Sequence, residues 1–566
     1  MRKLPVMILT AALAAGAAVV AQTGTAKTKA ASPKLSASAA AAMKSIDAER
    51  IRAHVRFLAH DLLEGRGTGQ RGGDIAAEYI ASQFALSGLK PAGEDNTYYQ
   101  RVPLVGVTTL PQTTFTIIPA SGQPMTLKHL DEYVATDQTQ QPENDVESEI
   151  VFVGYGIEAP EYKWNDYKNA DLRGKALLML VNEPPSEDEK FFKGKALTYY
   201  GRWTYKFEQA ARKGAVAAIL VHKTEMASYG WNVVRSSWSG ESSFLKAKGG
   251  ELKSAGWVQL EVARRLANAA GKDLDDLMRQ AASSDFRPIP LPLKLKTHMV
   301  SKIRRFESNN VIAVLPGSDT SLKDEAVVYT AHYDHLGIRP ERSGDNIYNG
   351  ASDNATGTAI LLEVARAFAA APQAPARSTI FAAVTAEEQG LRGSEYLGRK
   401  PPVSAGKITL NLNVDNVPPI GVPEEIEVTG AERTSFFPVV QMTARQFGLE
   451  IKPDSRPEAG HYYRSDHFSL ARVGVPGFTV NVGRKFKDKT TEWGAEQARI
   501  FNEQRYHQPS DEYRPEMDFS SNAVIGRFMY ALGWKAAELP QLIAWKPGDE
   551  FEAARQKSQG EARGSH

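Results

Sequence analysis

The chain has 566 residues, of which 42% are hydrophobic, enough for two or three globular domains. The overall charge is +2, but residues 1–42 hold five Lys and Arg residues and no acid, so the remainder carries −3. A nearly neutral body gives no reason to expect nucleic acid or an anionic membrane as a partner. Because cysteine is absent, disulfides, thiolate sites and a cysteine nucleophile are excluded, and any zinc site must use His, Asp and Glu.

The N-terminus predicts export. Arg2 and Lys3 precede an apolar run over 6–20 that is too short for a membrane span and ends in small residues. We therefore expect a signal peptide at 1–21, a periplasmic or secreted protein and no stable membrane anchor. Residues 22–44, rich in Ala, Ser, Thr and Lys, predict a disordered spacer.

Residues 45–126 are expected to form the first part of the main domain. Apolar residues from Ile51 to Leu62 fall at helical spacing, and a second helix is predicted over about 75–86. The glycine-rich stretch 65–73 between them contains a formal GxGxxG. A dinucleotide-binding loop follows a strand, whereas a helix precedes this one, so a plain turn is the better interpretation.

The sequence pattern changes over residues 127–297, and it predicts an inserted β-rich domain. Apolar runs at 150–156, 176–181 and 215–221 are typical of buried strands, and 207–213 of a short helix. The histidines in or next to this region lack the spacing of metal ligands; they are His129, His222 and His298. An accessory domain without chemistry is the simpler interpretation.

Strands and helices alternate after residue 310. This alternation predicts an α/β fold with a doubly wound, mostly parallel sheet, whose active site lies beyond the carboxyl ends of the strands. The predicted strands are 311–315, 326–331, 379–385, 408–414 and 478–482, with helices over 358–371 and 521–538. Residues 298–545 would complete the main domain, and 546–566 are expected to be a loose tail.

Potential metal ligands follow the predicted strand ends and one late polar loop. Singly, each has an ordinary explanation as a turn former, a helix cap or a solvated side chain. Gathered at one edge of a sheet, however, these carboxylates would repel one another unless divalent cations neutralised them. In chain order the residues are His332, Asp353, Glu387, Glu388, Asp415 and His507.

Two imidazoles and three carboxylates suit two zinc ions if one carboxylate bridges them. Glu387 and Glu388 are consecutive, so in extended backbone one can bind metal while the other faces the open coordination position. Two ions would polarise a carbonyl and acidify water, and the free glutamate would carry the proton to the leaving amine. Asp334, two residues after His332, is placed to orient its ring. This chemistry is peptide hydrolysis without a covalent intermediate.

Together these motifs resemble the co-catalytic zinc aminopeptidases of metallopeptidase family 28. The resemblance implies one zinc ion held by His332 and Asp415. A second would be held by Glu388 and His507, with Asp353 bridging the two. It further implies Glu387 as general acid and base, Asp334 as the partner of His332, and a cis Asp353–Asn354 peptide. The segments that carry it are AHYDH (331–335), GASDNATG (350–357), TAEEQGLRGSEYL (385–397), NVDN (413–416) and YHQPSDEY (506–513).

The inserted region resembles a protease-associated domain. The segments that carry this resemblance are VFVGYG (151–156), NDYKNADLRGK (165–175) and GRWTYKFEQAARKGAVAAILVH (201–222). Such a domain would lie over the catalytic face and shape substrate access without supplying metal ligands.

Two features of the sequence differ from the family pattern. His335 stands at a position where the family often has a small residue. It is either an exposed residue without a special role or part of a pocket wall. His461 and Asp466 lie near the predicted site and would contact substrate or the oxyanion, unless they serve as local caps.

The features favour an exported zinc aminopeptidase with two zinc ions and peptide substrates. Carboxypeptidase specificity remains an alternative, because the motifs define the bond chemistry but not which end of the peptide is held. Two further candidates are a glutaminyl-cyclase-like enzyme with a single zinc and a non-catalytic, receptor-like binding protein.

Overall fold

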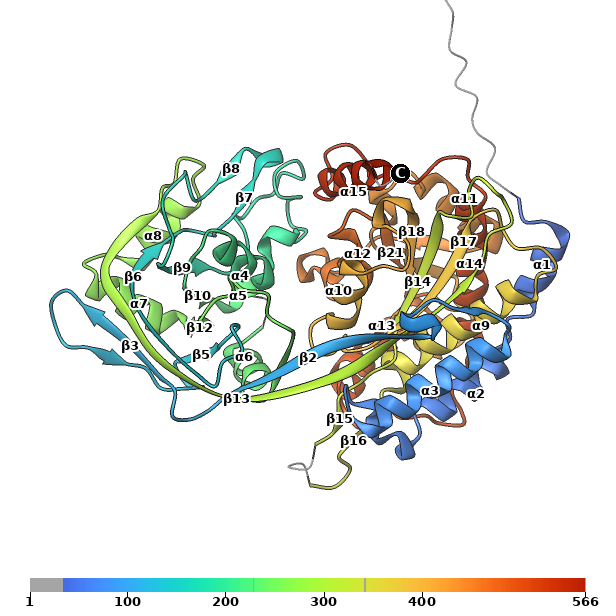
Figure 1. The fold of residues 1–566 in the computed structure, drawn as a ribbon, viewed down its shortest axis with the longest axis horizontal. Coiled ribbons are helices and arrows are strands. Elements are labelled where there is room, and N and C mark those ends of the chain that lie inside the picture. The colour runs from blue at the N-terminus through green and yellow to red at the C-terminus, as the bar shows by residue number, and fades with distance from the viewer. Residues whose placement is uncertain (1–33, 228, 340–342, 565–566) are drawn as a thin grey trace, which may run out of the picture.

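The computed structural model describes residues 34–227, 229–339 and 343–564. Figure 1 shows two lobes joined by two long strands, β2 (Tyr99–Thr109) and β13 (Ile289–Leu315). The predicted signal peptide and most of the predicted spacer lie outside the described residues. Within the described ranges, none of the helices has the combination of length and apolar composition needed to cross a lipid bilayer.

The sheet of the larger lobe is mostly parallel, as predicted. Its strand order is β21-β18-β14-β17-β13, and the first four strands run parallel to their neighbours, whereas β13 is antiparallel to β17. Parallel strands end at one edge, so residues just past β14, β17 and β18 come together there. These strands are β14 (Ala326–His332), β17 (Ser378–Val384), β18 (Ile408–Asn413) and β21 (Gly477–Thr479).

Both faces of this sheet are buried, which explains the unbroken apolar runs of its strands. Val327 and Tyr329 of β14 pack in one core with α9 and α14, whereas Val328 packs in the opposite core with α10 and α12. The four helices are α9 (Thr356–Ala370), α14 (Ser520–Ala537), α10 (Arg392–Arg399) and α12 (His467–Ala471). The doubly wound arrangement of the sequence prediction is therefore confirmed for this lobe.

Helices precede and follow this core where none was predicted. Helix α1 (Ala37–Lys44) lies within the predicted spacer, and the spacer prediction is wrong for these residues. Alanine has the highest helix propensity, the Ser36 side chain caps the helix by accepting from the Ala39 N–H at 3.1 Å, and Ala42 packs in the core. The helices predicted next are present as α2 (Ala48–Leu58) and α3 (Arg71–Leu86).

The predicted loose tail contains helix α15 (Glu552–Gly564), so that prediction is also wrong for these residues. Arg555 is buried, and its guanidinium donates to the carbonyl oxygens of Ile408 at 2.9 Å, Ala405 at 3.1 Å and Ile543 at 3.2 Å. The many charged residues suggested a solvated tail, but one of them, Arg555, is buried because backbone carbonyls satisfy its charge.

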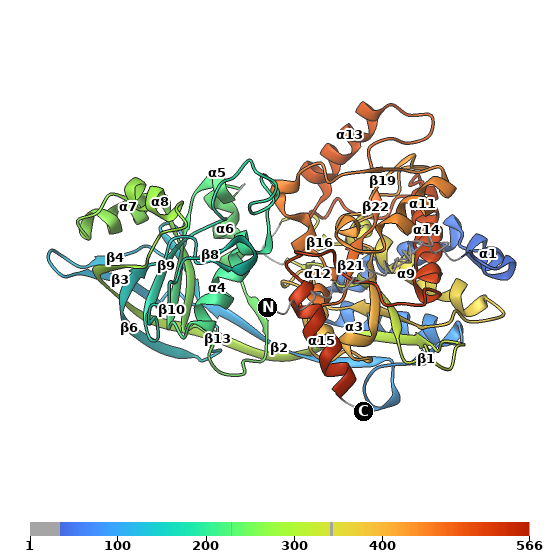
Figure 2. The same ribbon diagram turned by 90° about the horizontal axis from the view of Figure 1, so that it is seen from above.

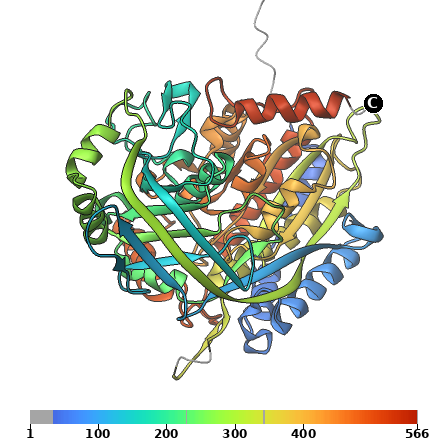
Figure 3. The same ribbon diagram turned by 60° about the vertical axis from the view of Figure 1, so that its left-hand side comes forward.

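The smaller lobe is β-rich, and its strands β6, β9, β10 and β12 form a parallel series. The first half of β13 pairs with β3 and β6, and the second half pairs with β2 and β17 (Figure 3). The boundary drawn at 297/298 therefore falls inside one continuous strand. The elements are β3 (Thr114–Pro119), β6 (Glu143–Phe152), β9 (Ala176–Leu180), α4 (Trp203–Arg212), β10 (Ala217–His222) and β12 (Ser254–Gln259).

Candidate metal centre

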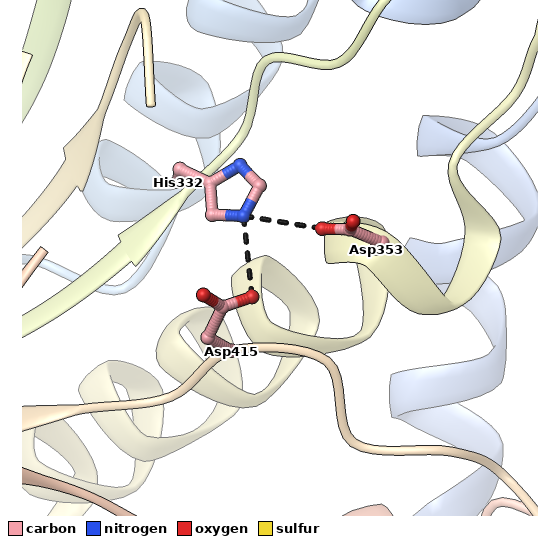
Figure 4. A group of neighbouring side chains, drawn as sticks. All are labelled: His332, Asp353 and Asp415. Atoms are coloured by element: carbon pink, nitrogen blue, oxygen red, sulfur yellow. Dashed lines mark hydrogen bonds and ion pairs between the residues drawn. The ribbon is translucent and has the colours of Figure 1, made fainter. Parts of the chain in front are cut away.

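One half of the candidate site is built by the ends of β14 and β18 and by the segment before α9. His332 is the last residue of β14, and its Nε2 lies 3.2 Å from Oδ1 of Asp415 and 3.3 Å from Oδ1 of Asp353. Figure 4 shows both carboxylates facing this nitrogen. The peptide between Asp353 and Asn354 is cis, as the family resemblance implied.

The other half lies on the far side of the Asp353 carboxylate. Nε2 of His507 is 3.3 Å from Oδ2 of Asp353 and 3.1 Å from Oε2 of Glu388. Asp353 therefore directs one oxygen to each of two histidines that lie 175 positions apart in the sequence. The structure brings together all five residues that were predicted as ligands.

The charges of these groups affect one another's ionisation. Burial by itself would raise the pKa of Glu388, but His507 and His335 outweigh it and lower the pKa to about 2. Burial likewise opposes the charged form of His507, yet Glu388 and Asp353 raise its pKa to about 11. Imidazolium and carboxylate thus stabilise each other here, and a cation placed between the carboxylates would take over the same role.

The donor set suits zinc by its chemistry. Ligand atoms of His332, Asp353 and Asp415 lie within 4.8 Å of one another. The same holds for His335, Asp353 and Glu388. Imidazole nitrogens and carboxylate oxygens are the donors that zinc takes in proteins where thiolates are absent. The residues present therefore fit the cofactor that the sequence predicts.

Asp334 contacts the ring of His332 in a different way from the one predicted. Its backbone oxygen, rather than its carboxylate, is the nearer partner of His332 Nδ1, at 3.2 Å against 3.8 Å for Oδ1. The carboxylate accepts from the Glu387 N–H at 3.1 Å and from the Thr68 hydroxyl at 3.0 Å. Burial raises the pKa of this carboxyl to about 6. Asp334 therefore positions the backbone of Glu387 as well as the ring of His332.

Glu387 faces an open cavity, whereas Glu388 is turned into the protein. The cavity has a volume of about 750 Å³, and Glu387 lines it together with His332, Asp353 and Asp415. Its outer wall includes residues of α13 (Thr491–Ile500), which projects beside the larger lobe in Figure 2. Burial, reinforced by the charges of nearby carboxylates, raises the pKa of Glu387 well above its ordinary value.

Three supporting residues were missed by the sequence analysis. Ser465 donates to Oδ2 of Asp415 at 2.6 Å, and Asp511 accepts from the Asp353 N–H at 3.0 Å. Arg66, fully buried in the glycine-rich turn, donates to backbone oxygens on both sides of the site; they belong to Leu58, Tyr333, Asn349 and Gly350. The available signals were the Ser-Asp-His run at 465–467 and the glycine spacing around Arg66.

The two candidate substrate contacts behave differently. His461 lines the cavity, and its Nδ1 lies 3.1 Å from Oδ1 of Asp454. Asp466 is buried, does not line the cavity and makes no side-chain cap to α12. Its charge is instead among those that raise the pKa of Glu387. The interpretation of Asp466 as a helix cap is therefore wrong.

His335 is neither a surface residue nor a cavity wall. Its side chain is fully buried, and Nδ1 lies 2.6 Å from Oε1 of Glu388. A histidine in a loop that follows a strand is more often exposed, but this one packs closely against Gly350 and the ring of His507.

Residues 310–532, which contain all of these strand ends, match the family model described as Peptidase family M28. A probable zinc metalloprotease of Leptosphaeria maculans is 30% identical over 165 residues, 28% of this chain and 33% of that protein. Leupeptin-inactivating enzyme 1 of Streptomyces exfoliatus is 26% identical over 254 residues, 43% of this chain and 51% of that enzyme. The chain thus covers a third to a half of the length of these relatives.

Two solved structures are similar to this chain over most of its length. An aminopeptidase from Aneurinibacillus sp. strain AM-1 superposes with a TM-score of 0.48 at 18% sequence identity, covering 90% of this chain and 98% of that one. A zinc aminopeptidase from Bacillus subtilis superposes with a TM-score of 0.41 at 17% identity, covering 90% of this chain and 97% of that one.

Proposed function

We propose that this protein is a zinc metallopeptidase that hydrolyses peptide bonds at the ends of the β14, β17 and β18 strands. The observation that carries the proposal is the Asp353 carboxylate, whose two oxygens each lie 3.3 Å from Nε2 of a different histidine. One carboxylate between two imidazoles, flanked by Asp415 and Glu388, is the arrangement that a bridged pair of cations requires. The match of residues 310–532 to a peptidase family supports the reaction class.

His332 and Asp415 would hold one zinc ion, Glu388 and His507 the other, and Asp353 both. When bound, the two ions would polarise the scissile carbonyl and lower the pKa of water at the site. The protein's own part in the reaction belongs to Glu387. Its carboxylate faces the cavity, where it takes a proton from water as the water adds to the carbonyl carbon. It then passes that proton to the departing amine nitrogen as the C–N bond breaks.

The surroundings of Glu387 suit this proton transfer. Its backbone N–H is held by the carboxylate of Asp334 at 3.1 Å, so the side chain starts from a defined position. Burial raises the pKa of Glu387, which makes its carboxylate a stronger base and helps it keep the proton until the amine departs. The ring of His332 is fixed by the backbone oxygen of Asp334 and by the carboxylates of Asp353 and Asp415.

Removal of N-terminal residues is the specificity that we propose first, as the family resemblance implies. Carboxypeptidase specificity is favoured by one observation. Arg456, Arg464 and Arg484 line the cavity, and within the described part of the chain none forms an ion pair with a carboxylate. Such guanidinium groups are suited to a C-terminal carboxylate. Two carboxyl groups near the same wall offer negative charge instead of positive. They belong to Glu427 and to Asp454, which contacts His461.

Hydrolysis of matched peptides tests both the reaction and its direction. Aminoacyl peptides with free amino termini should be cleaved, N-acetylated versions should resist cleavage, and a chelator should abolish activity. Cleavage of the acetylated peptides from the carboxyl end would establish the carboxypeptidase alternative. Absence of hydrolysis in both sets, with zinc bound, would favour a receptor-like protein, and one zinc per chain would favour a cyclase-like enzyme.

Export is part of the proposal, and it rests on the charged and apolar pattern of residues 1–21. Fractionation of cells that express the full chain should place the mature protein outside the cytoplasmic membrane, with cleavage near Ala21.

A further inference from the structure

The walls of the cavity carry more positive than negative side chains away from the metal centre. Apart from the metal ligands and Glu387, the acids that line it are Glu427, Glu516 and Asp518, and Glu516 is paired with Arg514 at 3.3 Å. Burial and the charge of Asp454 raise the pKa of Glu427 to about 7, which reduces its negative charge at neutral pH. The cavity therefore presents a positive wall to a substrate. Among the described residues, its lysine and arginine side chains are Arg456, Arg464, Arg484, Lys489, Arg505 and Arg514.

Arg464 is the cation of this wall whose backbone adjoins the Asp415 side of the metal centre. It directly precedes Ser465, whose hydroxyl donates to Oδ2 of Asp415 at 2.6 Å. Its side chain is exposed, lines the cavity and has neither an ion pair nor a hydrogen bond among the described residues. An extended peptide advances roughly 3.3–3.6 Å per residue. A substrate whose scissile bond lies at the metal centre therefore brings its neighbouring residues within reach of this guanidinium.

A second arginine, from the smaller lobe, lies close to Arg464. Arg202 directly precedes α4, and the segment before it packs against the larger lobe, where the ring of Tyr199 lies 6.2 Å from that of Tyr463. Nε of Arg202 is buried and has no hydrogen-bond partner in the described part of the chain. Burial lowers the pKa of Arg202 to about 10, and the charge of Arg464 acts in the same direction. The two lobes thus bring two positive charges together.

The acids of the neighbouring segments are engaged with other cations. Glu208 pairs with Arg472 at 2.9 Å, and Glu550 pairs with Arg433 at 2.6 Å. Two guanidinium groups that lie close together repel each other unless an anion joins them. A carboxylate relieves this repulsion and accepts two parallel hydrogen bonds from a planar guanidinium. The pair is therefore suited to a carboxylate that enters through the cavity.

We propose that Arg464, reinforced by the charge of Arg202, binds a carboxylate of the peptide substrate, so that the protein selects acidic peptides. This inference rests on the proposed function, because it names the substrate class of the same site. The carboxylate belongs either to an Asp or Glu side chain near the scissile bond or to the free C-terminus of a short peptide. In both cases the smaller lobe takes part in recognition without supplying a metal ligand.

Matched peptides bound to the full chain test the proposal. The tripeptides differ only in having Glu, Gln or Lys at one position, and each is made with a free and with an amidated carboxyl end. Calorimetry gives their affinity for the Glu387→Gln protein, which holds a peptide without cleaving it. Kinetics of the wild type give KM and kcat separately, and the zinc content of every variant shows whether the metal centre is intact.

We expect a peptide with the recognised carboxylate to bind about 10–100-fold more tightly than its neutral counterpart. The difference should shrink as the ionic strength rises. A preference for Glu over Gln with amidated ends identifies a side-chain carboxylate, and a preference for free over amidated ends identifies the C-terminus. Equal affinities in both comparisons would overturn the proposal.

Variants of the two arginines assign the preference to them. Arg464→Gln should abolish it mainly through KM, and Arg464→Lys should keep part of it because the charge remains. Arg202→Gln should weaken it about 2–5-fold, as expected for a charge that acts without direct contact. A preference of wild-type size in Arg464→Gln would overturn the proposal.

A matched control separates this effect from the loss of an arginine as such. Arg212 is the last residue of α4, lies 3.8 Å from Oε2 of Glu208 and does not line the cavity. Arg212→Gln should leave the preference unchanged. A wild type that binds acidic peptides but cleaves none would contradict the proposed function alone. Cleavage without any preference for a carboxylate would contradict only the role of the arginine pair.

Discussion

Each lobe buries a group of acidic side chains, and the two groups are compensated in different ways. In the smaller lobe, Asp166 accepts from the Ile157 N–H and the Trp164 indole, and Glu183 accepts from Thr198. Lys206 is fully buried, its Nζ has no hydrogen-bond partner among the described residues, and the charges of both acids act on it. Burial raises the pKa of both carboxyls and lowers that of Lys206, while the opposite charges of the lysine and the acids work against these shifts.

At the strand ends of the larger lobe, by contrast, the carboxylates face imidazoles and one another. Asp353, Glu388 and Asp415 receive no lysine or arginine ion pair within the described residues, and Glu387 adds a fourth acid beside them. Buried acids with a lysine charge close by are compensated within the protein, whereas acids whose ion-pair partners among the described residues are histidines can accept a cation from outside. The difference points to function in the larger lobe and to stability in the smaller one.

Replacing the shared carboxylate should give the largest effect. Asp353→Asn keeps the shape of the side chain but removes the charge that both histidines face, so we expect loss of bound zinc and a fall in hydrolysis of at least about 10⁴-fold. Elemental analysis and steady-state kinetics measure the two outcomes. A variant that retains two zinc ions and wild-type turnover would show that Asp353 does not bridge them.

Glu387→Gln should separate catalysis from metal binding. The amide cannot take up a proton, so the rate should fall about 10²–10⁴-fold while zinc content stays that of the wild type. Unchanged turnover would remove Glu387 from the mechanism. Loss of zinc would instead show that Glu387 is a ligand, and the roles of the adjacent glutamates would have to be exchanged.

Lys206→Met tests the compensated group of the smaller lobe. Leaving Asp166 and Glu183 without a nearby cation should destabilise the protein by about 3 kcal/mol, measured by denaturant unfolding at about pH 7.5. Adding Asp166→Asn and Glu183→Gln to the same chain should restore most of the loss. If Lys206→Met alone is as stable as the wild type, the lysine does not compensate these acids.

Glu363 gives the smallest expected effect and a test of the pH dependence. Burial opposes its charge, but His54 and Arg366 outweigh this and lower its pKa to about 2. Because the folded pKa lies below the unfolded value of 4.5, its contribution is complete above pH 4.5 and disappears as the pH falls towards 2. Glu363→Gln should therefore cost about 1–3 kcal/mol at about pH 6 and much less at about pH 2.5. An equal loss of unfolding free energy at both pH values would contradict the assignment.

Much of the larger lobe could be predicted from the sequence. The apolar runs at 326–331, 379–385 and 408–414 are long enough and uniform enough to indicate strands buried on both faces, and parallel strands bring their carboxyl ends together. For that reason His332, Glu388 and Asp415 could be grouped from the order of the strands alone. His507 was harder to place, and the family resemblance rather than periodicity assigned it.

Tertiary contacts decided the rest, because they join residues that no local pattern connects. Arg66 and Thr68 reach Tyr333 and Asp334 across more than 260 positions, and His335 packs so close to Gly350 that a side chain there would collide with its ring. Helices α1 and α15 are stabilised by packing against the larger lobe that their composition does not reveal. Local sequence thus determined which elements form and where their ends meet, while the packed structure determined which side chains hold the metal ligands in position.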